Sequence, residues 1–128
     1  MGTKKVLIVD DEQDVLVYFS TLFEDHGFEA ITAENGVIAI KFAKSESPDL
    51  ITLDITMPEQ SGILTYRYLK QDPDLRHIPI IFITAIGESI SDVIHQLSDF
   101  PEEKICLSKP IDIQELIDTA SKLTSSDT

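Results

Sequence analysis

Polar and charged residues follow four of the five short apolar runs in this chain, and they are the first candidates for chemistry. The acidic run 10–12 follows the first, Asp54 the third, Thr84 the fourth and Lys109 the fifth. Neighbouring carboxylates repel one another and raise each other's pKa unless a cation enters. Oxygen ligands of this kind suit Mg²⁺, which usually binds one or two carboxylates together with phosphate oxygens. The residue types therefore indicate a magnesium site that handles a phosphoryl group.

The remaining candidates fit the same chemistry. A lysine such as Lys109 supplies a positive charge for a phosphoryl group, and the Thr84 hydroxyl can donate to a phosphoryl oxygen. Phosphoryl transfer depends mainly on positioning and charge neutralisation, and the central Asp54 is the natural nucleophile. Each residue alone has an ordinary structural explanation, because acids cap helices, threonine is common in strands and lysine is usually solvated. Only the combination indicates a site.

Strands and helices alternate along the chain, which explains how these residues meet. Segments with apolar residues at helical spacing separate the apolar runs, and the runs are apolar on both faces, as in a parallel sheet covered on both sides. Five such units predict an α/β fold with an open, doubly wound sheet in three layers, since a barrel needs eight. The carboxyl ends of its strands share one edge. The expected strands are 6–9, 29–33, 49–53, 79–84 and 104–108.

Each intervening segment presents one apolar stripe for burial. The third helix is expected from Gly62 to Gln71, with Leu64 and Tyr68 on its exposed face, and Asp112 with Glu115 has capping-box spacing before the fifth. The expected stripes are Val15, Leu16, Phe19, Leu22 and Phe23; Ala39, Ile40 and Ala43; Ile63, Tyr66 and Leu69; Ile90, Val93, Ile94 and Leu97; and Ile113, Leu116, Ile117, Ala120 and Leu123.

Composition narrows the class of protein. The 128 residues predict one domain, with an ordered core at about 4–123 and a disordered tail at 124–128. A net charge of -13 argues against nucleic acid or an anionic membrane surface as a direct partner. No apolar run is long enough for a signal peptide or a membrane span, and the single cysteine, Cys106, forms no internal disulfide, so a soluble, cytoplasmic protein is expected. The three histidines, His26, His77 and His95, lack metal-ligand spacing.

The motif set resembles the response regulator receiver domain of bacterial two-component signalling over residues 4–123. The motifs are Val9-Asp10-Asp11-Glu12, Asp54 followed by Met57-Pro58 and Gly62, Thr84-Ala85, and Lys109-Pro110. The resemblance implies a flavodoxin-like fold, with a five-stranded parallel sheet in the order 2-1-3-4-5 and five helices.

The resemblance also implies a role for each site residue. Asp54 is similar to the aspartate that accepts a phosphoryl group from a kinase phosphohistidine. Asp11 and Asp54 resemble direct Mg²⁺ ligands, Asp10 a ligand acting through water, and Thr56 the residue whose main-chain carbonyl completes the site. Thr84 and Lys109 resemble the pair that holds the phosphoryl oxygens.

The implied protein is a signalling phosphoacceptor rather than an enzyme, although it assists its own Mg²⁺-dependent phosphorylation and dephosphorylation. Its implied partners are a sensor histidine kinase or histidine phosphotransfer protein and a downstream output domain or protein. The sequence departs from the family in two places. Cys106 stands where an aromatic residue usually precedes the lysine by three positions, and residues 98–103 replace a small-residue turn, which predicts a longer loop after the fourth helix.

Three other functions are considered. A haloacid-dehalogenase-type phosphatase carries a general acid two residues after its nucleophile, and here that residue is Thr56. A flavodoxin-like electron carrier needs a phosphate-binding first turn, where this chain has an acidic one. A receiver-like interaction module that is never phosphorylated stays open as the alternative, supported by the missing aromatic residue alone.

Overall fold

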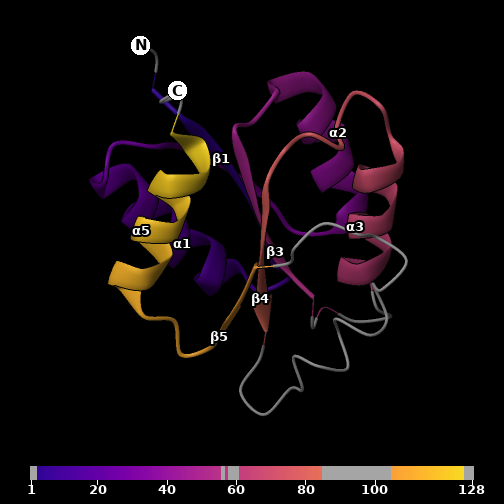
Figure 1. The fold of residues 1–128 in the computed structure, drawn as a ribbon. Helices are drawn as coiled ribbons and strands as arrows, with labels where there is room; N and C mark the ends of the chain where they lie inside the picture. Colours follow the sequence, from indigo (N-terminus) through magenta and orange to yellow (C-terminus); the bar gives the residue numbers. More distant parts are fainter. Residues whose placement is uncertain (1–2, 56, 58–60, 85–104, 126–128) are drawn as a thin grey trace.

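A computed structural model describes residues 3–55, 57, 61–84 and 105–125 of the chain. Within residues 3–84, strands and helices alternate as predicted (Figure 1). The strands are β1 (Lys5–Val9), β2 (Glu29–Ala33), β3 (Leu50–Asp54), β4 (Ile80–Thr84) and β5 (Ile105–Ser108). The described helices are α1 (Gln13–Asp25), α2 (Gly36–Glu46), α3 (Ser61–Gln71) and α5 (Ile113–Thr124). The helix expected around 90–97 and the loop expected at 98–103 lie outside the described residues.

The five strands form one parallel sheet in the order β2-β1-β3-β4-β5. The order confirms the predicted flavodoxin-like topology. Because β3 lies between β1 and β4, its last residue, Asp54, ends at the middle of the sheet edge. This edge of the sheet carries Asp54 and Lys109, together with the acidic segment that follows β1.

Helices cover both faces of the sheet and enclose a separate core on each. In Figure 1, α1 and α5 lie on one side of the sheet, and α2 and α3 lie on the other. Successive residues of a strand point to opposite faces. Accordingly, Leu7 and Val9 of β1 belong to the core beneath α2 and α3, whereas Val6 and Ile8 belong to the core beneath α1 and α5. The double coverage explains why the strands are apolar on both faces.

A short polar side chain caps the start of α2 and the start of α5, and the cap of α5 is the one that the sequence predicts. The Asn35 side chain accepts a hydrogen bond from the Ile38 amide at 2.9 Å at the start of α2. The Asp112 side chain accepts one from the Glu115 amide at 3.0 Å at the start of α5. Each bond satisfies an amide that has no partner within its helix. Both helices are therefore fixed by short polar residues just after a strand or loop.

The predicted helix stripes are largely confirmed among the described residues. In α3, Ile63, Tyr66 and Leu69 are buried while Leu64 and Tyr68 are exposed. The expectation for Ile113 is wrong, because its side chain is 41% exposed. Ile113 is the first residue of α5. A residue of an apolar stripe is buried only where another element of the fold packs against it. At the edges of the cores, partial burial is found for Val15, Leu22, Ile40 and Leu123.

The C-terminal helix continues slightly beyond the predicted ordered core. It includes Thr124, which is buried and whose hydroxyl donates to the Ala120 carbonyl at 2.8 Å. Across the described part of the chain, every helix is too short or too polar to cross a membrane.

Candidate functional site

Two buried aspartates and one lysine meet at the carboxyl edge of the sheet. Asp10 directly follows β1 and is 1% exposed, and Asp54 ends β3 and is 2% exposed. Lys109 follows β5, and its Nζ lies 3.5 Å from an Asp10 oxygen and 3.6 Å from an Asp54 oxygen. The structure thus brings together three of the predicted site residues, which are separated by up to 99 positions in the chain.

Burial strongly affects the ionisation of Asp10. The pKa of the Asp10 carboxyl is raised to about 6, chiefly by burial and also by the nearby Asp54 carboxylate, while the hydrogen bond from the Glu12 amide and the charge of Lys109 oppose the rise. That hydrogen bond measures 2.9 Å. The neighbouring carboxylates of the site therefore repel one another, and a bound cation would reduce this repulsion.

Lys109 is the positive partner of both acids. Burial disfavours its charged form, but Asp54 and Asp10 outweigh burial, and the pKa of the Lys109 ammonium is raised. Lys109 is therefore a permanent cation at neutral pH. Its charge is placed between the two carboxylates rather than in solvent.

The carboxylates of Asp10, Asp11 and Glu12 form a second grouping at this edge. Their oxygens lie within 4.8 Å of one another, with Asp10 buried and the other two exposed. This donor set fits a hard divalent cation, because all its atoms are oxygens and two of the side chains are open to water. Glu12 was not predicted as a ligand, although it is the third consecutive acid. Thr56 lies outside the described residues.

Thr84 ends β4 and is fully buried. Its hydroxyl donates to the Ser108 hydroxyl at 3.3 Å, and its carbonyl accepts a hydrogen bond from the Lys109 amide at 2.9 Å. Thr84 and Ser108 are partners in the register of β4 and β5. Thr84 therefore reaches the predicted edge, but in this structure its hydroxyl is bonded to a neighbouring strand. Sequence reasoning did not identify Ser108, which is recognisable only once this register is known.

Gly62 lets the start of α3 approach the end of β3. A Cβ at this position would lie 2.5 Å from the Asp54 carbonyl oxygen and 2.5 Å from the Ile55 Cα. Real Cβ atoms essentially never come so close to backbone atoms. Glycine at this position therefore allows α3 to lie this close to the segment that carries Asp54.

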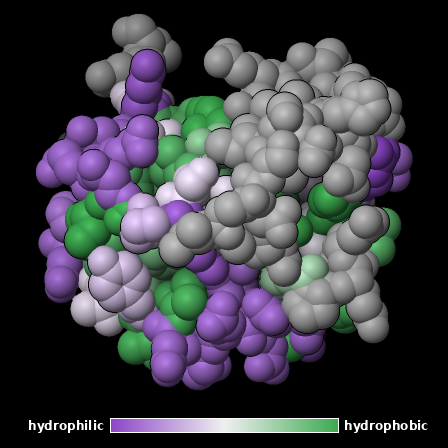
Figure 2. Space-filling model, turned by 90° about the horizontal axis from the view of Figure 1, so that it is seen from below, coloured by the Kyte–Doolittle hydropathy of each residue, from purple (hydrophilic) through white to green (hydrophobic). Residues whose placement is uncertain are grey.

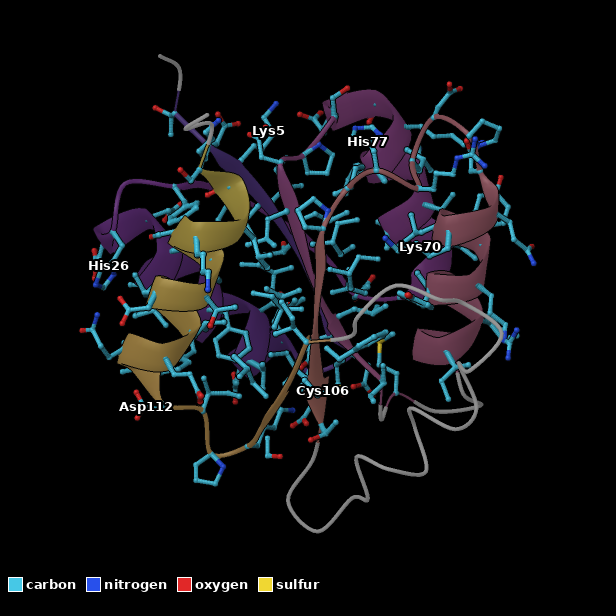
Figure 3. All side chains as sticks on the ribbon, in the orientation of Figure 1. Lys5, His26, Lys70, His77, Cys106 and Asp112 are labelled. Atoms are coloured by element: carbon cyan, nitrogen blue, oxygen red, sulfur yellow. The ribbon has the colours of Figure 1, made fainter. Side chains whose placement is uncertain are left out.

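The other candidates take structural positions. Cys106 is partly buried, pairs with Phe82 in the register of the sheet and packs against the core beneath α2 and α3. His26 and His77 are exposed, and His95 lies outside the described residues. In Figure 3, Cys106 and Asp112 lie in the lower half of the molecule, while Lys5 and His77 lie at the opposite edge. Viewed from below, hydrophilic residues occupy much of the described surface (Figure 2).

Comparisons with known proteins agree with this geometry. A family model described as the response regulator receiver domain matches residues 6–121. The polar-differentiation response regulator DivK of Brucella ovis is 37% identical over 118 residues, which are 91% of this chain and 93% of that protein.

Solved structures share the whole fold. The receiver domain of a signal transduction histidine kinase from Syntrophus aciditrophicus matches with a TM-score of 0.82 and 30% identity, over 98% of each chain. The receiver domain of the Francisella response regulator 1452 matches with a TM-score of 0.79 and 28% identity, over 95% of this chain and 97% of that one. Fold, acidic edge and sequence agree: this chain belongs to the response regulator receiver domains, the phosphoacceptor modules of two-component phosphorelay signalling.

Proposed function

We propose that this receiver domain accepts a phosphoryl group on Asp54. The observation that carries the proposal is the position of the Lys109 ammonium, 3.6 Å from Asp54 and 3.5 Å from Asp10 at the end of the central strand. A buried carboxylate beside a fixed cation is held where an incoming anion can be neutralised. Because this chain is a receiver domain, we infer that it has a kinase partner. The donor proposed here is the phosphohistidine of a sensor histidine kinase or of a histidine phosphotransfer protein.

The proposed step transfers the phosphoryl group from nitrogen to oxygen. A carboxylate oxygen of Asp54 attacks phosphorus, and the bond from phosphorus to the imidazole nitrogen breaks. The electron pair of that bond stays on the imidazole, and Asp54 becomes an acyl phosphate. Lys109 neutralises charge on the phosphoryl oxygens throughout. The Thr84 hydroxyl breaks its hydrogen bond to Ser108 and donates to one of these oxygens instead.

Magnesium is the proposed cofactor. The residues that would hold it are Asp10, Asp11, Asp54 and the main-chain carbonyl of Thr56, with the Glu12 carboxylate close enough to join them. When bound, a divalent cation offsets the charge that accumulates as the phosphoryl group meets the carboxylate. The high pKa of Asp10 supports this proposal, because the site gains most from a cation that relieves the repulsion.

The proposed consequence of phosphorylation is a change in what the domain binds. A downstream output domain or protein would distinguish the two states, because Thr84 and Lys109 both change partners when a phosphoryl group arrives on Asp54. A ligand shifts such an equilibrium only through contacts that differ between the states.

Incubation with acetyl phosphate and Mg²⁺ tests the proposal. Intact-mass measurement is expected to show one phosphoryl adduct, which is absent without Mg²⁺ and absent in Asp54→Asn. Asp118→Asn is the matched control, because Asp118 is an exposed acid on α5 and its loss leaves the site intact. An adduct that persists in Asp54→Asn would assign the phosphoryl group to another residue and refute the proposal.

A further inference from the structure

The Thr84 hydroxyl is already bonded before any phosphoryl group is present. It donates to Ser108 at 3.3 Å across the last pair of β4 and β5. Thr84 is fully buried, whereas Ser108 is exposed. A buried hydroxyl without a partner is costly, so this bond stabilises the arrangement in which Thr84 faces Ser108.

The two hydroxyls belong to the opposite face of the sheet from the phosphoacceptor. Side chains alternate along a strand, so Thr84 and its partner Ser108 follow Phe82 on the face beneath α2 and α3. Asp54 pairs with Ile83, which packs in the core beneath α1 and α5. The Thr84 hydroxyl therefore cannot donate to Ser108 on one face and to a phosphoryl oxygen on Asp54 at the same time. The two acceptors compete for it.

We propose that Ser108 is a positioning residue that holds Thr84 in the unphosphorylated arrangement and so sets how readily the domain switches. The inference rests on the proposed function, because it requires Thr84 to bind a phosphoryl oxygen. Ser108 acts through Thr84 and makes no contact with the phosphoryl group. Its hydroxyl lowers the affinity of the site for a phosphoryl group by stabilising the competing state.

The expected effect is measurable. A neutral hydrogen bond changes an equilibrium by roughly two- to tenfold. Replacing Ser108 with alanine removes the acceptor and leaves the buried Thr84 hydroxyl without this partner. The unphosphorylated state loses stability, and the phosphorylated state does not. Binding of beryllofluoride, which imitates a phosphoryl group on a carboxylate, is therefore expected to tighten by about two- to tenfold in the presence of Mg²⁺.

A double-mutant cycle separates this role from a merely structural one. Beryllofluoride affinity is measured for the parent, Ser108→Ala, Thr84→Ala and the double variant, with Ser108→Thr as the variant that keeps a hydroxyl. Ser108→Ala is expected to bind more tightly than the parent, and Ser108→Thr is expected to match the parent. In the Thr84→Ala background, Ser108→Ala is expected to change nothing, because the bond that it removes is already gone.

The outcomes are distinguishable. Equal affinity of Ser108→Ala and the parent would overturn the inference, and so would a tightening that persists in the Thr84→Ala background. Either result leaves the proposed function intact, provided that Asp54 is labelled and Thr84→Ala weakens beryllofluoride binding. A parent protein that neither binds beryllofluoride nor takes a label on Asp54 would refute both proposals.

Discussion

The ammonium nitrogen of Lys109 lies 3.6 Å from a carboxylate oxygen of Asp54, although β4 separates their two strands in the sheet. The long side chain of Lys109 also reaches Asp10, on the far side of Asp54. One cation therefore serves two buried acids. Removal of this cation leaves two carboxylates without their shared partner, which is costly in a buried site.

Lys109→Gln is expected to weaken beryllofluoride binding by about 10- to 100-fold, the range for hydrogen bonds to charged groups. It is also expected to lower the melting temperature at pH 7, because Asp10 and Asp54 then repel each other without compensation. Titration and thermal melting measure the two effects. Lys122→Gln, which changes an exposed lysine of α5, is the control. Unchanged binding in Lys109→Gln would show that the lysine plays no part in holding the anion.

Millimolar Mg²⁺ is expected to raise the melting temperature of the parent. A cation that binds the folded state alone stabilises it by mass action, by about 1–3 kcal/mol at concentrations well above the dissociation constant. Asp11→Asn is expected to raise the metal-free melting temperature, because it reduces repulsion at the edge, and to shrink the Mg²⁺ increment. Asp14→Asn removes an exposed acid of α1 outside the acidic grouping and keeps the increment. A full increment in Asp11→Asn would remove Asp11 from the ligand set.

The pKa of Asp10 predicts how stability depends on pH without metal. The folded state raises this pKa from 3.8 to about 6, so between these values the folded protein binds more protons than the unfolded chain. The contribution of Asp10 to stability is therefore present at low pH and is lost as the pH rises from about 4 to about 6. The loss is on the order of 1–3 kcal/mol.

Asp10→Asn tests this sign directly. The variant is expected to flatten the fall in unfolding free energy between pH 4 and pH 6, measured by denaturant titration without Mg²⁺. Asp112→Asn, which keeps a side-chain oxygen at the exposed start of α5, leaves the fall unchanged. A parent whose stability rises over this interval, with the same rise in Asp10→Asn, contradicts the assignment.

Gly62→Ala is expected to destabilise the protein by about 1–3 kcal/mol and to slow labelling of Asp54 by acetyl phosphate. The added methyl group would meet the backbone at Asp54 and Ile55, so α3 or the end of β3 has to move. Gly27→Ala is the informative comparison. Gly27 has a φ of +89° but open space around its Cβ position, so alanine there costs stability without disturbing the site. Normal labelling in Gly62→Ala would show that this close approach does not position Asp54.

Cys106→Ala is expected to leave phosphorylation of Asp54 intact while lowering stability by about 1 kcal/mol, through the loss of a partly buried side chain from the core. Mass measurement after acetyl phosphate treatment, together with a denaturation curve, checks both parts. A well-folded variant that no longer takes the label would give Cys106 a chemical role that its position against Phe82 does not suggest.

The sequence predicts most of the fold because its strongest signals are local. Apolar runs and helical stripes identify the described strands and helices, and the spacing of Asp112 and Glu115 marks the start of α5. Convergence of Asp10, Asp54 and Lys109 follows from the rule that parallel strands end at one edge. The bond between Thr84 and Ser108 could not be predicted, because it depends on the register of β4 against β5. The exposure of Ile113 could not be predicted either, because a stripe does not show where the facing surface ends.

The hydrogen bond from the Lys109 amide to the Thr84 carbonyl has a consequence for the two groups proposed to hold the phosphoryl oxygens. Their backbones are joined at 2.9 Å, so neither can drift far without the other. Bringing the Lys109 ammonium and the Thr84 hydroxyl to the same edge costs conformational entropy. This cost falls on folding, when β4 pairs with β5, rather than on binding of the anion. For Thr84 and Lys109 themselves, an arriving phosphoryl group therefore has to order the side chains and not the paired backbones.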